Sequence, residues 1–172
     1  MKKKITLIFL LSFNINFGQS EIYYKKNCVS LEFFGHSSSV ISFNFERIIN
    51  PYDMIKFTAK IGIGQNPSYE IKDTKFYYNS TIPIVITTLL GHKYNFAQFG
   101  MGYSATFASN LNDDISIPNV IYPRFESGYS LSLGYRYMRD DLIFQLYPIL
   151  EWRTITEPKA KLWFGISMGK AF

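Results

Sequence analysis

A period-two alternation of apolar and polar residues recurs along this chain and limits the folds it can adopt. In Met54–Gly64, apolar side chains occupy the odd-numbered positions from Ile55 to Ile63, whereas Lys, Thr and Gly occupy the even-numbered ones from Lys56 to Gly64. Successive side chains of a strand point to opposite faces, so this pattern predicts a strand with one apolar and one polar face. The same alternation marks Val29–Gly35, Ser39–Arg47, Phe96–Phe107, Phe125–Tyr137 and Lys161–Phe172.

Two further segments, Thr81–Leu90 and Leu142–Leu150, are apolar on both faces. Their lengths and flanking turns predict strands, and their facing stays open. Pro83 and Pro148 predict bulges in them, because proline cannot donate a ladder hydrogen bond. The chain thus contains about eight strand segments of roughly the length that a tilted membrane strand needs. After the N-terminal segment, no run of ~18 apolar residues predicts a transmembrane helix.

The links between these segments alternate in length. Links 48–53, 91–95 and 138–141 are short, whereas links 65–80, 108–124 and 151–160 are long. Membrane barrels have short periplasmic turns and longer external loops, so this alternation predicts an antiparallel up-and-down barrel with a periplasmic N-terminus. The link 36–38 is an exception, because it falls among the external links and is short.

A soluble barrel such as a lipocalin also alternates, with its apolar face inward. Here the polar face consists largely of Gly, Ser and Thr, which suits a crowded lumen better than open solvent. Aromatic residues make up 18% of the chain, and several fall near strand ends, where interfacial girdles of membrane barrels lie. These are Tyr103, Tyr129, Tyr135, Tyr137, Trp152 and Trp163. We therefore predict an all-β transmembrane barrel whose apolar face meets lipid.

The N-terminus predicts a secretory signal peptide over residues 1–20, which leaves 21–172 as the barrel domain. Basic Lys2–Lys4 precede the apolar run Ile5–Leu11, and small residues Gly18 and Ser20 follow. The run is too short for a transmembrane helix. Removing Lys2–Lys4 leaves 15 basic against 13 acidic residues, so no nucleic-acid partner is expected. The single cysteine, Cys28, excludes an internal disulfide.

The C-terminal segment ends in Phe172, with Phe164, Ile166 and Met168 on the same face and Lys170 as a departure from the pattern. It is similar to the final strand of outer-membrane barrels. With segments 42–47, 81–84 and 133–137, the whole chain resembles the small eight-stranded outer-membrane barrels common in Bacteroidota, of OmpA and OmpX architecture. The resemblance implies outer-membrane lipid and the barrel-assembly machinery as partners, with Phe164, Ile166, Met168 and Phe172 as an assembly signal. It specifies no activity.

Charged residues on the polar face predict a network inside the lumen. A turn centred on Pro51 would place Glu46 opposite Lys56 and Ser42 opposite Lys60, and a hairpin centred on Ser37 would place Glu32 opposite Ser42. A buried charge without a partner is costly, so opposite signs are expected to face one another. We interpret the network as a structural plug, because side chains fill an eight-stranded barrel; a gated ion or proton path is the alternative. Its predicted members are Glu32, Glu46, Lys56, Lys60 and Arg136.

No catalytic, cofactor or metal site is expected. His36, Ser38 and Glu46 invite comparison with lipid A deacylases, but a serine-rich tight turn explains His36–Ser38 better. The adjacent carboxylates Asp113 and Asp114 lack the further oxygens that Ca²⁺ needs. The pairs Gly62/Gly64 and Gly100/Gly102 lack the third glycine and the helix of a nucleotide loop, so we expect them to relieve crowding.

These features predict an outer-membrane barrel with a structural or external-interaction role and no open pore. Loops 65–80 and 108–124 would meet external ligands, and Tyr69, Phe76, Tyr77 and Tyr78 would supply adhesive area. A narrow channel for small or apolar solutes is the alternative, and a lipid-modifying enzyme is a third possibility. The sequence names no ligand and no oligomeric state.

Overall fold

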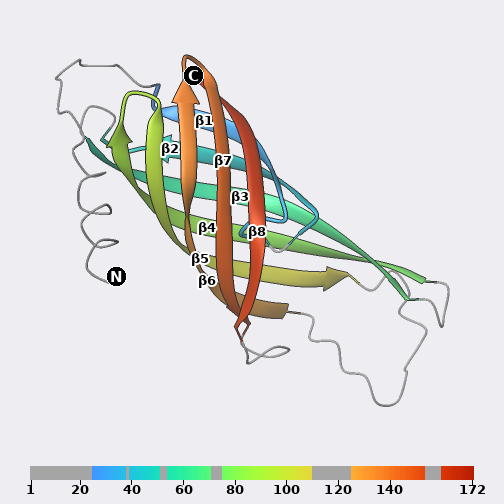
Figure 1. The fold of residues 1–172 in the computed structure, drawn as a ribbon. Coiled ribbons are helices and arrows are strands. Elements are labelled where there is room, and N and C mark those ends of the chain that lie inside the picture. The colour runs from blue at the N-terminus through green and yellow to red at the C-terminus, as the bar shows by residue number, and fades with distance from the viewer. Residues whose placement is uncertain (1–24, 38, 51–53, 71–74, 110–124, 154–159) are drawn as a thin grey trace, which may run out of the picture.

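The described residues form eight antiparallel strands that close into one barrel (Figure 1). The structure is a computed structural model that describes residues 25–37, 39–50, 54–70, 75–109, 125–153 and 160–172. Each strand pairs with its neighbours in the sequence, and the first strand pairs with the last. The strands are β1 (Asn27–Phe33), β2 (Ile41–Ile48), β3 (Ile55–Glu70), β4 (Lys75–His92), β5 (Asn95–Ser109), β6 (Phe125–Arg139), β7 (Leu142–Arg153) and β8 (Lys161–Ala171).

This topology confirms the predicted all-β, up-and-down antiparallel barrel. The closing pairs run from Cys28 opposite Ala171 to Phe33 opposite Ile166, as expected for a final strand that pairs with the first. Closure matters because it gives both edge strands a hydrogen-bonding partner. The described part of the chain contains no helix that is long and apolar enough to span a membrane.

The link predicted over 65–80 is mostly strand, which corrects the sequence reading. Gln65–Glu70 pair with Lys75–Ser80 and prolong β3 and β4, beyond the last β2–β3 pair of Ile41 with Gln65. In Figure 1 this hairpin extends past the link between β1 and β2. The alternation ends at Gly64, but backbone hydrogen bonds across a hairpin need no apolar face, so pairing continues where the pattern stops.

The barrel has two different ends. At one, which we call the short-turn end, Lys93–Tyr94 and Asp140–Asp141 connect neighbouring strands. Lys93 and Asp140 both adopt a positive φ, 56° and 53°, in these tight reversals. The β2–β3 connection lies at this end too. The other end, the long-link end, carries the β1–β2, β3–β4, β5–β6 and β7–β8 connections. They include the predicted external loop 108–124, of which residues 110–124 lie outside the described part.

Where the structure describes the side chains of the strands, they alternate between the lumen and the outer wall. The structure settles the two strands whose facing was open: Val85, Thr87 and Leu89 of β4 and Ile143, Gln145 and Tyr147 of β7 are buried inside. The predicted bulges at Pro83 and Pro148 are wrong. The register is the same for Ile61–Ile84 and Gly64–Thr81 on either side of Pro83, and for Ser132–Ile149 and Tyr135–Leu146 on either side of Pro148.

Candidate functional site in the barrel lumen

An apolar plug fills the lumen at the short-turn end. Seven mutually contacting residues form it, and all are at least 96% buried. They come from β1, β2 and β4 to β8, so the plug ties most of the barrel wall together. Non-directional burial of this kind contributes about 25 cal/mol for each Å² removed from water. The members are Cys28, Ile48, Leu89, Phe96, Met138, Ile143 and Ala171.

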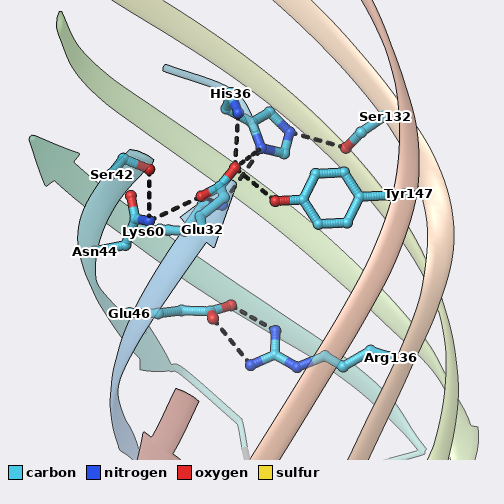
Figure 2. A network of polar contacts seen from close by, with 9 residues as sticks. All are labelled: Glu32, His36, Ser42, Asn44, Glu46, Lys60, Ser132, Arg136 and Tyr147. Atoms are coloured by element: carbon cyan, nitrogen blue, oxygen red, sulfur yellow. Dashed lines mark hydrogen bonds and ion pairs between the residues drawn. The ribbon is translucent and has the colours of Figure 1, made fainter. Parts of the chain in front are cut away.

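A bidentate ion pair crosses the lumen next to this plug. Nη1 and Nη2 of Arg136 donate to Oε1 and Oε2 of Glu46 at 2.6 and 2.9 Å. Arg136 lies on β6 and Glu46 on β2, so the pair connects opposite sides of the wall (Figure 2). Both side chains are almost completely buried. The fork geometry of guanidinium and carboxylate offsets part of the desolvation cost of the two charges.

A second carboxylate, Glu32, is the centre of a larger network (Figure 2). Lys60 Nζ lies 2.9 Å from Oε2, and Asn44 donates to the same oxygen at 2.8 Å. The Tyr147 hydroxyl donates to Oε1 at 2.6 Å. The backbone N–H of His36 donates to Oε1 at 2.7 Å. Glu32 is fully buried, and four donors from four parts of the chain stabilise its charge.

The short link between β1 and β2 folds into the lumen. Phe34 reverses the chain at a positive φ of 53°, and His36, Ser37 and Ser39 are buried beyond it. His36 Nε2 lies 3.0 Å from Ser132 Oγ on β6, and its ring lies 5.1 Å from that of Tyr147. We call this segment, residues 35–39, the inserted link. Because it turns into the lumen, it forms no long loop at the position where the sequence predicts an external one.

Glycines of β3 and β5 make room for the inserted link and for Ser132, which His36 contacts. A Cβ atom at Gly64 would lie 2.7 Å from Ser37 Oγ, and one at Gly100 would lie 2.5 Å from Ser132 Oγ. Real Cβ atoms do not approach so closely, so larger residues would displace the link or its partner. The expectation that the Gly-x-Gly pairs relieve crowding agrees with these positions.

The predicted register between β2 and β3 is wrong by four residues. Glu46 lies opposite Lys60 and Ser42 opposite Gly64, whereas Glu32 does lie opposite Ser42 as expected. The turn is not centred on Pro51, because the Asn50 side chain accepts from Phe57 N and donates to Ile55 O, both at 2.6 Å. These bonds belong to a turn placed later in the sequence.

The structure therefore places four of the five predicted lumen charges in two ion pairs. Glu32 with Lys60 and Glu46 with Arg136 form ion pairs. Lys56 is also buried, with Nζ 5.6 Å from the ring centre of Phe96. Sequence reasoning missed Asn44, Ser132 and Tyr147. Asn44 and Ser132 are polar residues on the lumen face of alternating strands, and this pattern could have identified them. Leu142–Leu150 is apolar on both faces, so the sequence did not show that Tyr147 points inward.

His36 contacts Ser132 and Glu32, a set that superficially matches a nucleophile, a base and an orienting carboxylate. Its Nδ1 lies 3.3 Å from Glu32 Oε1 and also 3.3 Å from Lys60 Nζ. An ammonium group only donates, so a bond from Lys60 to Nδ1 leaves the proton on Nε2, which then donates to Ser132. That is the reverse of what a general base needs, and the geometry favours a structural network. Ser38 lies outside the described residues.

A third ionic group lies near the long-link end. Arg153 Nη1 lies 3.2 Å from Glu126 Oε2, and its Nε lies 3.5 Å from Glu151 Oε1. Both carboxylates point inward from β6 and β7 and are largely buried. Sequence reasoning did not single out these residues, because they fall at the ends of the predicted strands.

The remaining candidate residues lie elsewhere. Phe164, Ile166 and Met168 are exposed on the outer wall, and Phe172 is exposed at the short-turn end, where its N–H donates to Asn27 O at 2.8 Å. Asp113, Asp114, the side chains of Tyr69 and Phe76–Tyr78, and the predicted signal peptide lie outside the described part. Among the described residues, no group of three His, Cys, Asp or Glu side chains is placed to hold a metal ion.

Comparison with models of known protein families, with curated proteins and with solved structures found no match to this chain.

Proposed function

We propose that this protein is an integral outer-membrane β-barrel with a closed lumen and a structural or external-interaction role. The observation that supports this most strongly is the polarity of the barrel. Seven charged side chains are buried inside it, whereas large apolar side chains are exposed on its outer wall and the exposed charges lie toward its two ends. A soluble barrel has the opposite arrangement, because water is its outer solvent.

The outer wall exposes large apolar side chains on every strand. Leu133 is 64% exposed, Met168 63% and Ile86 57%, although each lies next to a buried polar or small lumen residue. Contiguous apolar patches on soluble monomers rarely exceed a few hundred Å². A continuous apolar wall around a closed barrel fits a lipid environment, in which the backbone is already satisfied by its own ladder.

Aromatic pairs lie on the outer wall toward both ends. Toward the long-link end, the ring centres of Tyr103 and Tyr129 lie 5.5 Å apart and those of Phe107 and Phe125 lie 5.4 Å apart, with the rings tilted by 60° and 58°. Tyr94 and Tyr137 lie 6.3 Å apart at the short-turn end. Aromatic rings toward both ends of the outer wall are what the two membrane–water interfaces favour.

Fractionation tests the membrane location. The chain should sediment with outer membranes and resist extraction with alkaline carbonate. In gels without boiling, the folded barrel should migrate differently from the boiled form. A protein recovered in the soluble periplasmic fraction would contradict the proposal.

The filled lumen argues for a closed barrel rather than a channel. The apolar plug, the Glu46–Arg136 pair and the inserted link occupy successive levels inside the wall. In planar bilayers we expect no steady conductance from the purified protein. Discrete channel steps from the wild type would favour the channel alternative.

The β3–β4 hairpin supports the external-interaction role, because it extends the barrel wall beyond the end of β2. In the proposed orientation it faces the cell exterior. A cysteine at Ser68→Cys should react with a membrane-impermeant maleimide on intact cells, whereas Lys93→Cys in the short turn should react only after the outer membrane is permeabilised. The reverse result would invert the orientation.

The barrel-assembly machinery is the proposed partner of the final strand. Phe172 and the outward Phe164, Ile166 and Met168 supply the aromatic end and the apolar face that the resemblance associates with this role. Deleting Phe172 should lower the folded amount in cells more than deleting one residue from loop 108–124. Equal amounts would show that Phe172 has no special role in assembly.

We propose no enzymatic role for His36 and its neighbours, because Lys60 competes with Glu32 for Nδ1. The variant His36→Ala should leave the lipid A composition of the cells unchanged. If lipid A acylation differs between cells with the wild type and cells with the variant, and the variant is folded, the lipid-modifying alternative is supported.

A further inference from the structure

The exposed charges of the described residues are distributed unevenly between the two ends of the barrel. Seven described side chains are exposed cations, and only Lys161 lies at the long-link end. Among described acidic side chains, Asp140 is exposed and Asp141 half-exposed, and both lie in one short turn. The six cations at the short-turn end are Lys25, Lys26, Arg47, Lys93, Arg139 and Lys170.

Some of these six cations already have partners. Lys25 Nζ lies 2.5 Å from Asp141 Oδ1. Arg139 Nε lies 3.7 Å from Asp140 Oδ2, and its guanidinium lies over the ring of Tyr94. Of the other four cations, Lys93 lies in the β4–β5 turn, whereas three lie together on the side of the barrel around β1. Arg47 on β2 and Lys170 on β8 flank β1, and Lys26 immediately precedes β1. We call Lys26, Arg47 and Lys170 the basic rim.

The basic rim borders the apolar wall directly. Arg47 comes two residues after the outward Phe45 on β2, and Lys170 comes two residues after the outward Met168 on β8, so each cation shares the outer face. Lys170 lies between Val29 of β1 and Leu142 of β7 in the ladder. Adjacent strands are about 4.8 Å apart, so β2 and β8 are roughly 10 Å apart across β1. A ligand that meets these cations therefore also lies against apolar side chains.

We propose that the basic rim binds the phosphate headgroups of anionic phospholipids in the leaflet that surrounds the short-turn end. Arg47 offers a guanidinium fork that matches phosphate oxygens, and the two lysines add point charges on flexible stems. The acyl chains of the same lipid lie along Leu31, Phe45 and Met168, which are 45%, 40% and 63% exposed. This inference rests on the proposed membrane location and adds a lipid preference to it.

Electron spin resonance of spin-labelled lipids tests this proposal. The purified full chain is folded into phosphatidylcholine vesicles that contain a trace of spin-labelled phosphatidylglycerol or phosphatidylcholine. The fraction of motionally restricted label gives the relative affinity of the two lipids for the protein surface. For the wild type at low salt, we expect a preference for phosphatidylglycerol of about fivefold, the effect of one favourable lysine or arginine contact.

The combined variant Lys26→Gln, Arg47→Gln and Lys170→Gln should reduce this preference to below about twofold. The matched control, Lys161→Gln, removes a cation from the opposite end of β8 and should keep the wild-type preference. High salt should also weaken the wild-type preference, because exposed charges are screened at a Debye length of about 3 Å in 1 M salt. The salt measurement uses only the wild type, so it does not depend on whether a variant folds.

The outcomes separate this inference from the membrane proposal. Restricted label that is equal for both lipids in the wild type, or a preference that the triple variant retains, overturns the lipid inference alone. A complete lack of restricted label shows that the barrel does not enter the bilayer, and overturns both. A preference that Lys161→Gln abolishes as strongly as the triple variant places the charge effect at the wrong end and also overturns the inference.

Discussion

The apolar plug and the Glu46–Arg136 level are neighbours inside one barrel, yet they are stabilised in opposite ways. The plug consists of seven side chains that pack without preferred directions. The ionic level depends on two hydrogen bonds of 2.6 and 2.9 Å between two charges. Both are shielded from solvent to nearly the same degree, so burial alone does not separate them. The difference lies in what happens when one partner is removed.

A packed apolar level loses only the contacts of the atoms removed, plus a cavity term. A buried pair that loses one partner leaves an uncompensated charge, which costs more than the pair contributed. The lumen of this barrel therefore combines an apolar level that tolerates the loss of side-chain atoms with an ionic level that does not tolerate the loss of one partner. The following predictions test that contrast by urea unfolding of the purified barrel, in detergent micelles unless lipid vesicles are named.

The largest loss is expected for Arg136→Met, which keeps much of the side-chain volume and leaves the Glu46 carboxylate buried without its fork. Breaking such a pair costs about 3–5 kcal/mol of unfolding free energy. The double variant Glu46→Gln/Arg136→Met should recover part of that loss, because no unpaired charge remains. If the double variant is as unstable as the single one, the loss comes from packing, and the contrast with the plug disappears.

The outer wall provides a second contrast, since its membrane-embedded middle should not accept a charge. Leu133→Arg places a cation on the wall next to Ser132, and should destabilise the barrel in lipid vesicles by about 2–4 kcal/mol if the site lies near the membrane midplane. The control Leu133→Ala opens no closed cavity and should cost much less. An arginine at this site without effect on unfolding would contradict the lipid-facing assignment.

Within the plug, Ile143→Val removes one buried methylene and should cost about 0.5–1.5 kcal/mol. Its neighbour Leu142 is 64% exposed on the outer wall, so Leu142→Val should cost less than Ile143→Val. Equal costs for the two would mean that the plug is not packed more tightly than the wall. A cost for Ile143→Val above that of Arg136→Met would invert the order of the two levels.

The smallest effect is expected at the surface. A hydrogen bond from Lys25 lowers the pKa of the Asp141 carboxyl below its ordinary value. A lowered pKa means that the contribution is present above the unfolded pKa of about 3.9 and is lost as pH falls through the folded pKa. Asp141→Asn should therefore remove a small stability difference between pH 6 and pH 3, whereas Asp140→Asn should change it less. Identical pH profiles for wild type and Asp141→Asn would show that the exposed pair contributes nothing.

The alternation of residues determined the fold class of this protein without any tertiary information. Met54–Gly64 and Phe125–Tyr137 carry a strict period of two, and the short and long links set an up-and-down order, so a closed antiparallel barrel followed. The alternation did not determine where the strands end. β3 and β4 continue through Gln65–Ser80 because backbone pairing needs no alternation. Thr81–Leu90 and Leu142–Leu150 revealed no facing, because both of their faces are apolar.

Only the tertiary structure decided which charges meet. The register of β2 and β3 depends on how Asn50 bonds to the turn, and a shift of that turn changes every opposite pair. Ser132, His36 and Tyr147 are far apart in the sequence and come together because barrel closure and the inserted link place them around Glu32. Periodicity records the face of a residue, since that follows from local backbone geometry. Contacts across a lumen depend on register and closure, which are properties of the whole barrel.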